Sequence, residues 1–389
     1  MKIVSIETVT VNVPFRRRHR SSGRVGRGVT RTIVKVHTDA GVTGLGESLH
    51  YQSKYVIDHV LAPAALGADP HDLARLRARF LPGLGMPGTF GRAWESDPWA
   101  YGGVEMALYD IVGKSTGRPV HALLGGRVRE RVPFTAYYYP PLEETDPEVI
   151  AQGAAAVLET MRAGTLELKV GVHAPERDVE TIRRLREHVG PALDIRIDAN
   201  GAWSTGTAIR TLAALEPHRL ANVEEPCRGL VAMAEVREHT TTPLSTHCAD
   251  AAVVARLGAA DNIVLDLPSE GGLASAKEAA AAAEALGLGF WMRSTGELGI
   301  ATAAIVHLAA AMPSMVHANQ TVLHLLDGDV VSTPFQMTDG HVDVPDAPGL
   351  GVDLDEGLVR EYARRFDDEG PCWFWAGPGG TEWEPARIW

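Results

Sequence analysis

The sequence has few cysteines and no long apolar run. Its three cysteines, Cys227, Cys248 and Cys372, include no CxxC pair, which argues against a disulfide framework or a structural zinc site. The first residues, MKIVSIETVTVNV, alternate like a strand, with no basic region followed by an apolar one, and no apolar run reaches the length of a membrane span. We therefore expect a cytoplasmic protein with no membrane partner.

Positive charge is also scarce. The formal net charge is -12, and the one basic cluster in the sequence is the short run of Arg16, Arg17, Arg18 and Arg20. We interpret this run first as a solvated loop and second as a binder of an anionic substrate, and we expect no nucleic-acid partner. Neither GxGxxG after a strand nor GxxxxGK[ST] occurs in a suitable context, which disfavours a nucleotide-binding enzyme.

The 389 residues, of which 45% are hydrophobic, are enough for one large domain and a smaller one. The first part reads as strand, loop, strand and turn in ETVTVNVPF, RTIVKVHTDAG and VTGLGES. Helical spacing of apolar residues follows over about 56–78 and 104–116, and Gly117 and Pro119 mark the second stop.

After LLGGRV, short apolar strands alternate with alanine-rich helices. Eight candidate strands are VPFTAYYY, TLELKVG, DIRIDAN, NVEEP, PLSTH, NIVLDL, GFWMRS and SMVHAN. Eight such units predict a closed (β/α)8 barrel, whose active site lies at the C-terminal strand ends. Six polar residues close these strands and should converge there: Lys169, Asp198, Glu224, His247, Asp266 and Arg293.

The motifs GVTGLGES, GVEMALYDIVGKSTGRPVHALLGG, LKVGV, RIDANGAW, VEEPC, TPLSTHCAD, GIATAAIVHLAAA and PGLGVDLD occur in order over nearly the whole chain. In these motifs the sequence resembles the enolase superfamily, in its mandelate racemase and muconate-lactonizing branch, and looks most like the glucarate dehydratase group with altered catalytic positions. The fold class that we expect is α/β: a modified (β/α)8 TIM-type barrel at 126–354, an α+β N-terminal capping domain at 1–125, and a C-terminal segment at 355–389 that packs on the cap. Dimers or larger homo-oligomers are common in that family and are expected here.

The resemblance implies abstraction of a proton alpha to a carboxylate, with the resulting enediolate held against a divalent cation, usually Mg²⁺. Asp198 and Glu224 match the first two metal ligands, and Lys169 matches the base, whose pKa should be lowered by burial near the cation. The alternatives are strand-end carboxylates in salt bridges and a snorkelling surface lysine. Asn200, two residues after Asp198, should point the same way and contact substrate or metal indirectly, whereas a typical second lysine is replaced by Glu167.

His247 stands where the glucarate dehydratase group has an amide or carboxylate as third ligand. Imidazole suits Mg²⁺ poorly and Mn²⁺, Fe²⁺, Co²⁺ or Zn²⁺ better. His247 is therefore either a ligand that changes metal preference, with Mn²⁺ or Zn²⁺ in place of Mg²⁺, or a hydrogen-bonding neighbour behind the ligands; as a third alternative, the site binds metal weakly or not at all.

The side of the predicted site across from Lys169 also departs from the family pattern. The family pairs an aspartate on the sixth strand with a histidine on the seventh; Asp266 matches the first, and Arg293 replaces the second. Arginine is a poor acid, so the two read as a fixed ion pair or a clamp for a substrate carboxylate. Asn319 and Gln320 stand where related dehydratases have another acid, so that Lys169 remains as the single base.

Further candidate substrate contacts are Tyr137, His19 and Arg20, with core packing or solvent exposure as the alternative for each. His19 is also a candidate to donate a proton to the leaving group.

The leading hypothesis is a metal-dependent, dehydratase-like lyase acting on a small hydroxylated carboxylate such as a sugar acid. The alternatives are a cycloisomerase or epimerase of the same superfamily, or a catalytically silent homologue that binds an acid ligand.

Overall fold

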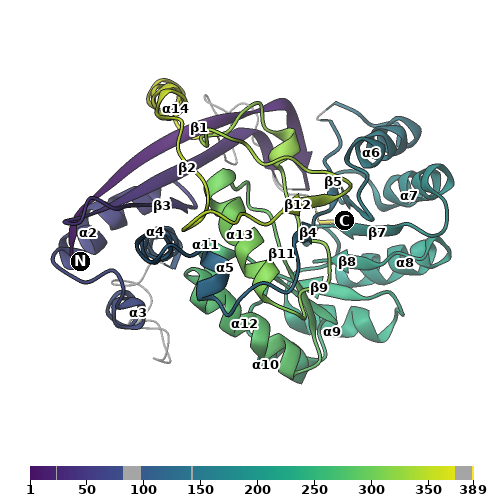
Figure 1. Ribbon diagram of the computed structural model, residues 1–389. Coiled ribbons are helices and arrows are strands. Elements are labelled where there is room, and N and C mark those ends of the chain that lie inside the picture. The colour runs from purple at the N-terminus through teal and green to yellow at the C-terminus, as the bar shows by residue number, and fades with distance from the viewer. Residues whose placement is uncertain (23, 82–97, 142, 373–387) are drawn as a thin grey trace.

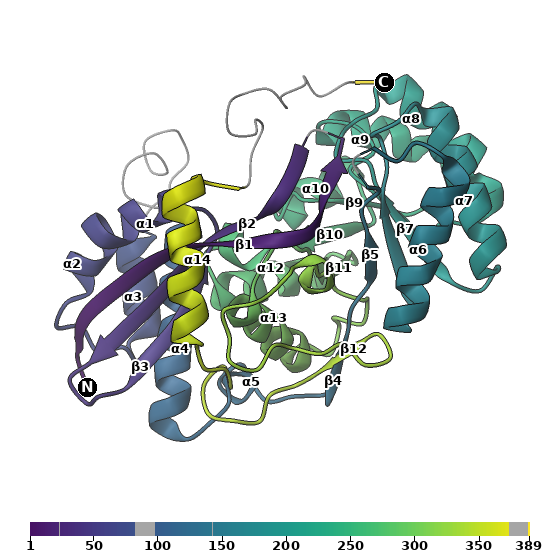
Figure 2. The ribbon, with the colours of Figure 1, turned by 90° about the horizontal axis from the view of Figure 1, so that it is seen from above.

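The computed structural model describes residues 1–22, 24–81, 98–141, 143–372 and 388–389. The N-terminal domain is built on an antiparallel sheet in the order β1-β2-β3, formed by β1 (Ile3–Ser21), β2 (Arg24–Thr38) and β3 (Thr43–Ser48). Figure 2 shows β1 and β2 as long ribbons that extend from this domain over the barrel. Their far ends therefore reach the barrel and can contribute to a site there.

The helices of the capping domain pack against this sheet. They are α1 (Gln52–Val56), the π-helix η1 (Ile57–Leu61), α2 (Ala62–Ala65), α3 (Leu73–Phe80) and α4 (Pro98–Thr116). The expected helix at 104–116 is confirmed as part of α4, which ends before Gly117 with its left-handed φ of 66°. The expected single helix over 56–78 is wrong, because the chain leaves the helix at Leu66, whose ψ is 132°.

The barrel domain has seven parallel strands in the order β11-β10-β9-β8-β7-β6-β5. They are β5 (Ala136–Tyr138), β6 (Thr165–Lys169), β7 (Asp194–Asp198), β8 (Asn222–Glu224), β9 (Leu244–Thr246), β10 (Asn262–Leu265) and β11 (Gly289–Met292). The α/β architecture with a separate capping sheet is thereby confirmed, and apolar side chains on both faces of the strands form one continuous core with the surrounding helices.

Helices follow the strands on the outside of the barrel (Figure 1). They are α6 (Pro147–Met161), α7 (Pro175–Val189), α8 (Thr205–Leu215), α9 (Leu230–Glu238), α10 (Ala251–Leu257), α11 (Leu267–Glu270), α12 (Leu273–Ala285) and α13 (Gly299–Ala311). Shorter elements are α5 (Val120–Leu123), the 3-10 helices η3 (Glu216–His218) and η4 (Leu323–Leu325), and the antiparallel pair β4 (Arg131–Pro133) and β12 (His341–Asp343).

The eighth expected strand, SMVHAN, is not a regular strand. Only Asn319 forms a parallel bridge, with Phe134. The backbone N–H of Asn319 donates to Pro133 at 2.9 Å, and that of Gln320 donates to Met292 of β11 at 2.9 Å. This short segment thus closes the barrel between β11 and the chain just before β5.

The C-terminal segment begins with α14 (Glu356–Glu369), which lies along the capping sheet in Figure 2. Lys35 of β2 contacts Glu356 at 2.6 Å, and the Asn12 amide donates to Gly370 at 2.7 Å. Trp389 lies instead on the barrel, where its backbone N–H donates to Ala202 at 2.8 Å. The expectation that the segment packs on the cap is therefore corrected for Trp389, and residues 373–387 lie outside the described residues.

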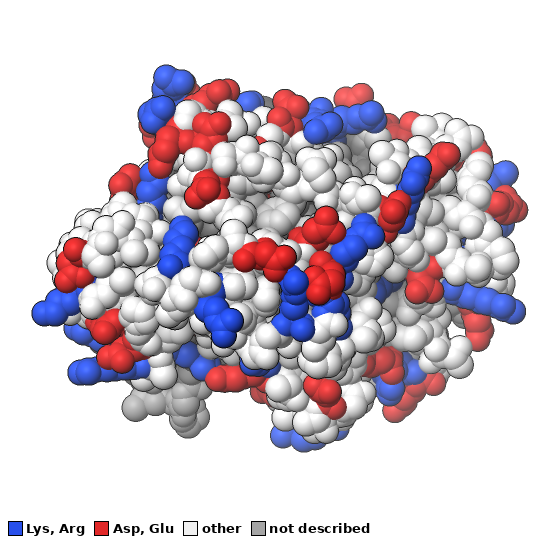
Figure 3. Space-filling view, viewed as in Figure 1, with Lys and Arg blue, Asp and Glu red and all other residues white. Residues whose placement is uncertain are grey.

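Acidic and basic side chains alternate over the face shown in Figure 3. Among the described residues, no helix combines the length and the apolar character that crossing a membrane requires.

Candidate active site

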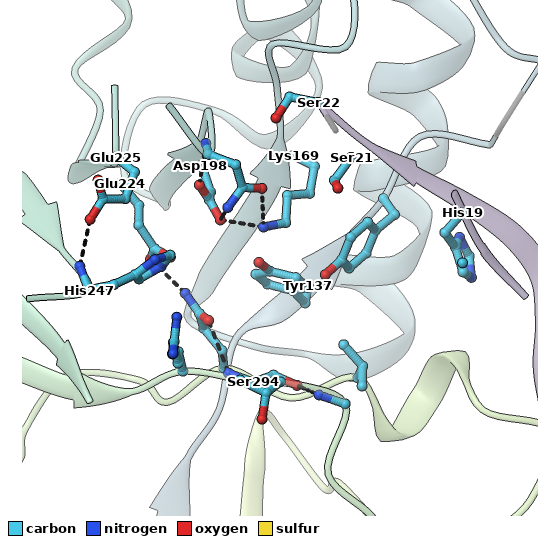
Figure 4. Close-up of a pocket in the computed structure, with 18 of the residues that line it drawn as sticks. His19, Ser21, Ser22, Tyr137, Lys169, Asp198, Glu224, Glu225, His247 and Ser294 are labelled. Carbon is cyan, nitrogen blue, oxygen red and sulfur yellow. Dashed lines mark hydrogen bonds and ion pairs between the residues drawn. The ribbon is translucent and has the colours of Figure 1, made fainter. Parts of the chain in front are cut away.

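A cavity of about 490 Å³ opens at the C-terminal ends of the barrel strands, a size typical of small-ligand sites. The capping domain contributes Phe15, His19, Ser21, Ser22 and Gly26 to its wall. Figure 4 shows His19, Ser21 and Ser22 on one side and the barrel residues Lys169, Asp198 and His247 facing them. The cavity therefore lies between the two domains.

Strand register brings the predicted residues together. Lys169 is paired with Asp198, and Asp198 with Glu224, across β6, β7 and β8. Neighbouring parallel strands lie about 4.8 Å apart, so these side chains emerge side by side. Lys169 forms an ion pair with Asp198, and its ammonium group also donates to the Asn200 amide oxygen at 2.7 Å.

Asn200 reaches the Lys169 ammonium group by a turn of the chain and not, as predicted, in an extended strand. Strand β7 ends at Asp198, and Asn200 adopts a left-handed φ of 49°, which asparagine tolerates better than most residues. Its backbone N–H donates to Asp198 at 2.8 Å. The turn therefore holds both the amide and the carboxylate beside Lys169.

Asp198, Glu224 and His247 form a cluster in which one ligand atom from each lies within 4.8 Å of the others. The Nε2 atom of His247 is 2.7 Å from Oε1 of Glu224. Glu225 also lines the cavity, and its carboxylate accepts from the His247 backbone N–H at 2.7 Å. The cluster offers two carboxylates and one imidazole, a donor set that fits a divalent transition metal.

Burial sets the charge of His247. It lowers the pKa of the imidazole to about 4, helped by the positive charge of Arg293. His247 is therefore neutral at neutral pH, which is the form that binds metals. Burial also raises the pKa of Glu224, because a carboxylate loses hydration when it is enclosed.

The pKa of Lys169 is set by opposing effects. Burial by itself lowers it, but Asp198, together with Tyr139 and Glu224, raises it above the ordinary lysine value. Burial pushes the pKa of Asp198 upward while Lys169 pushes it downward, and their contact favours the ion pair. The lysine is thus the direct counter-ion of Asp198, and the lowered pKa expected beside a bound cation stays a prediction.

Arg293 and Asp266 lie on the opposite wall. Arg293 lines the cavity, and its Nη2 atom is 3.6 Å from Asp266. Asp266 is not among the lining residues; it caps α11 and accepts from the Thr295 hydroxyl at 3.2 Å. Asp266 thus forms the expected ion pair with Arg293, and its side chain holds Arg293 and the following loop in place.

Of the predicted substrate contacts, Tyr137, His19 and Asn200 line the cavity. Burial lowers the pKa of His19 to about 4, and neither ring nitrogen has a hydrogen-bond partner among the described residues. The side chain of Arg20 lies outside the described residues.

The prediction that Asn319 contacts the substrate is corrected. Its amide oxygen accepts from Met292 at 2.9 Å, and its amide nitrogen donates to Pro133 at 3.3 Å, so it closes the barrel and does not line the cavity. The next residue, Gln320, lines the cavity instead. This placement could not be predicted, because the register of an irregular segment cannot be read from strand alternation.

Tyr139 and Arg228 are among the lining residues that were not predicted. Tyr139 follows Tyr137 by two residues and its ring centroid is 5.5 Å from the Lys169 ammonium group; the two-residue period of a strand could have indicated it. Arg228, an exposed residue of the loop after β8, adds a second arginine to the wall. Nothing in its local sequence distinguishes it from an ordinary surface arginine.

Two family models match the chain. The mandelate racemase / muconate lactonizing enzyme N-terminal domain matches residues 4–125, and the enolase C-terminal domain-like model matches residues 149–358. The predicted family resemblance is thereby confirmed.

Individual proteins match over most of their length. The chain is 33% identical over 374 residues to a probable glucarate dehydratase of Streptomyces coelicolor, covering 87% of this chain and 86% of that protein. It is 30% identical to a chloromuconate cycloisomerase of Cupriavidus pinatubonensis, and the match covers 91% of this chain and 96% of that protein. A crystal structure of an enolase from Thermobispora bispora, complexed with magnesium and formate, superposes with a TM-score of 0.87 at 31% identity, covering 96% and 95%.

Proposed function

The chain belongs to the mandelate racemase / muconate lactonizing enzyme family of the enolase superfamily, and from this premise we propose that it is a metal-dependent lyase. Its reaction removes a proton alpha to a carboxylate and then the hydroxyl group beta to it, on a small hydroxylated acid such as a sugar acid. The observation that carries the proposal is the shared cavity wall in which Lys169 adjoins the cluster of Asp198, Glu224 and His247.

In this proposal Asp198, Glu224 and His247 would hold the cation, which would supply positive charge that stabilises the enediolate. Lys169 would take the alpha proton. Tyr137 and Tyr139 enclose its ammonium group at 5.6 and 5.5 Å from their ring centroids, and this enclosure excludes water from the base.

Arg293 has the role of a clamp. A guanidinium group is a poor proton donor, so Arg293 would bind a carboxylate or another electronegative group of the substrate and would not shuttle protons. Asp266 keeps it on the cavity wall. A single base on one face supports syn elimination.

The same one-base arrangement supports a second candidate, a cycloisomerase, in which Lys169 exchanges a proton during ring closure. The similarity to a chloromuconate cycloisomerase favours testing it. The two reactions differ in their products, because the lyase releases water and forms a keto acid, whereas the cycloisomerase forms a lactone without loss of water.

The first test is metal binding by the native chain and by His247→Asn, titrated with Mg²⁺, Mn²⁺ and Zn²⁺. We expect one ion per chain and a preference of the native protein for Mn²⁺ or Zn²⁺, since imidazole is a softer ligand than an amide oxygen. The substitution should shift that preference toward Mg²⁺. Absence of binding of all three ions by the native chain would contradict the proposed chemistry and favour a silent ligand-binding homologue.

The second test is proton exchange in D2O with a panel of aldonic and aldaric acids and with cis,cis-muconate. With the preferred metal, we expect deuterium at the alpha carbon or loss of water for the correct acid. Lys169→Met should lower the rate about 10²- to 10⁴-fold, the usual contribution of a general base, while metal binding persists. Turnover by this variant at the native rate would remove Lys169 from the mechanism.

A further inference from the structure

Gln320 joins three parts of the barrel through one carboxamide group. Its side chain is buried, at 1% exposure. The amide nitrogen donates to Oε1 of Glu167 at 2.6 Å and to Oε2 of Glu224 at 2.7 Å. The amide oxygen accepts from the backbone N–H of Ser294 at 3.1 Å.

These partners determine which way the amide points. A backbone N–H can only donate, so the Ser294 N–H requires the oxygen of Gln320 on its side. The NH2 group must then face the two carboxylates, each of which accepts. All three hydrogen bonds of the carboxamide require this orientation, and a flipped amide would break each of them.

Glu224 is consequently held at both of its oxygens. Gln320 donates to Oε2 from the barrel interior, and His247 contacts Oε1 at 2.7 Å from the cavity side. Figure 4 shows Glu224 and His247 side by side at the cavity wall. The carboxylate cannot rotate without losing one contact, so its orientation within the cluster is predetermined.

Glu167 is the second anchor of Gln320. It lies two residues before Lys169 on β6, so its side chain is on the same face of the strand, one layer deeper in the barrel. Glu167 is fully buried. Beside it on β7, Arg196 is paired with Glu167, stacks on Trp291 at 4.0 Å and donates to Ala318 at 2.9 Å, so the neighbour of Glu167 is also held.

We propose that Gln320 is a positioning residue that orients Glu224 as a metal ligand, with Glu167 as its support. The inference deepens the proposed function and rests on it, because it assigns to Glu167 and Gln320 a role in metal affinity and geometry. Hydrogen-bond partners behind a metal ligand typically contribute 10- to 100-fold to affinity. The pair would therefore act on the cation without touching it.

The experiment measures Mn²⁺ affinity by calorimetry and the bound Mn²⁺ spectrum by electron paramagnetic resonance. Gln320→Met keeps the side-chain length and removes the donors; we expect about 10- to 100-fold weaker binding and an altered spectrum. Glu167→Leu removes the oxygen that accepts from Gln320, and its affinity and spectrum should change in the same direction as those of Gln320→Met. If Gln320→Met does not fold, Gln320→Asn, which withdraws the amide from Glu224, should change the spectrum in the same direction.

Asn12→Leu is the matched control. Asn12 is also a buried amide, and it accepts from Thr30 at 2.6 Å and donates to Gly370 at 2.7 Å in the capping domain. The Asn12→Leu protein should be less stable than the native protein and should keep the native Mn²⁺ affinity and spectrum. Native affinity and spectrum in the Gln320 variants would overturn the inference, while failure of the unaltered protein to bind Mn²⁺, Mg²⁺ or Zn²⁺ would instead overturn the proposed function.

Discussion

Lys169 shows how neighbouring groups can reverse the effect of burial on a residue. Burial lowers the pKa of Lys169, but Asp198 in direct contact, together with Tyr139 and Glu224, raises it above the ordinary lysine value. In the proposed mechanism, Lys169 would therefore accept a proton only when another positive charge occupied Asp198. Metal binding and basicity would then be coupled through the contact between Lys169 and Asp198.

Asp178 offers a test of burial at a residue outside the cavity. It is 4% exposed and accepts from the Gly171 backbone at 2.8 Å. Burial raises its pKa to about 8 from an ordinary value of 3.8. The folded state therefore keeps a proton that the unfolded state loses, so the stability contribution is full below pH 3.8 and is lost as pH rises toward 8.

We expect Asp178→Asn to remove this loss of stability with rising pH. The free energy of unfolding of the variant should rise relative to the native protein between about pH 4 and pH 8 and stay constant above, since the amide has no proton to lose. Urea denaturation across this range measures it. Glu176→Gln removes an exposed carboxylate from the same helical turn as the control. A pH-independent difference for Asp178→Asn would show that Asp178 is ionised in the folded protein.

At the scale of elements, β3 and α4 pack backbone against backbone. A Cβ added at Gly44 would lie 2.0 Å from the Ala107 carbonyl oxygen, and one added at Gly46 would lie 1.9 Å from the Gly103 carbonyl oxygen. Those atoms belong to the helix backbone and cannot move aside. The two glycines of VTGLGES thus allow α4 to approach the sheet, which explains their spacing of two on one face of the strand.

Gly46→Ala should therefore cost about 3 kcal/mol or more of unfolding free energy, the upper end of overpacking effects. Gly164→Ala is the matched control, because a Cβ there meets nothing within 4 Å; we expect a neutral or slightly stabilising effect. Thermal and urea denaturation measure both. A Gly46→Ala protein as stable as the control would mean that α4 can shift away from β3 at little cost.

At the scale of the molecule, one arginine of the capping sheet holds the barrel. Arg31 of β2 donates to the carbonyl oxygens of Thr295 and Gly296 at 2.6 and 2.7 Å and pairs with Glu47 at 3.4 Å. Glu47 in turn accepts from Leu298 and Ala301 at the start of α13. The loop after β11, which carries the cavity wall next to Arg293, is therefore held by the cap.

Arg31→Met should lower the unfolding free energy by about 3–5 kcal/mol, because it leaves the buried Glu47 without its partner. Hydrogen exchange at 294–298 should rise as well. Arg77 is the control: it joins α3 of the cap to Glu278 of α12 at 2.6 Å, but with side-chain exposures of 24% and 65%, so Arg77→Met should cost less than about 1 kcal/mol. Equal effects of the two substitutions would show that the loop is not held through Arg31.

Much of this architecture could be read from the chain. Alternating segments and a glycine turn indicated the capping sheet, and repeated apolar strands that end in polar residues indicated the barrel. The convergence of Lys169, Asp198 and Glu224 followed from parallel pairing alone, because parallel strands present their C-terminal ends at one edge. Local patterns suffice wherever a regular element fixes the direction of its side chains.

The remaining features depended on contacts between distant segments. The closure through Asn319, the placement of Gln320 behind Glu224, the pKa of Lys169 and the hold of Arg31 on the loop after β11 each involve partners separated by many residues. Sequence alone determined which residues share an edge of the barrel, since strand geometry is local. Only the tertiary structure decided which atoms meet and which charges they carry, because hydrogen bonding and desolvation depend on three-dimensional surroundings.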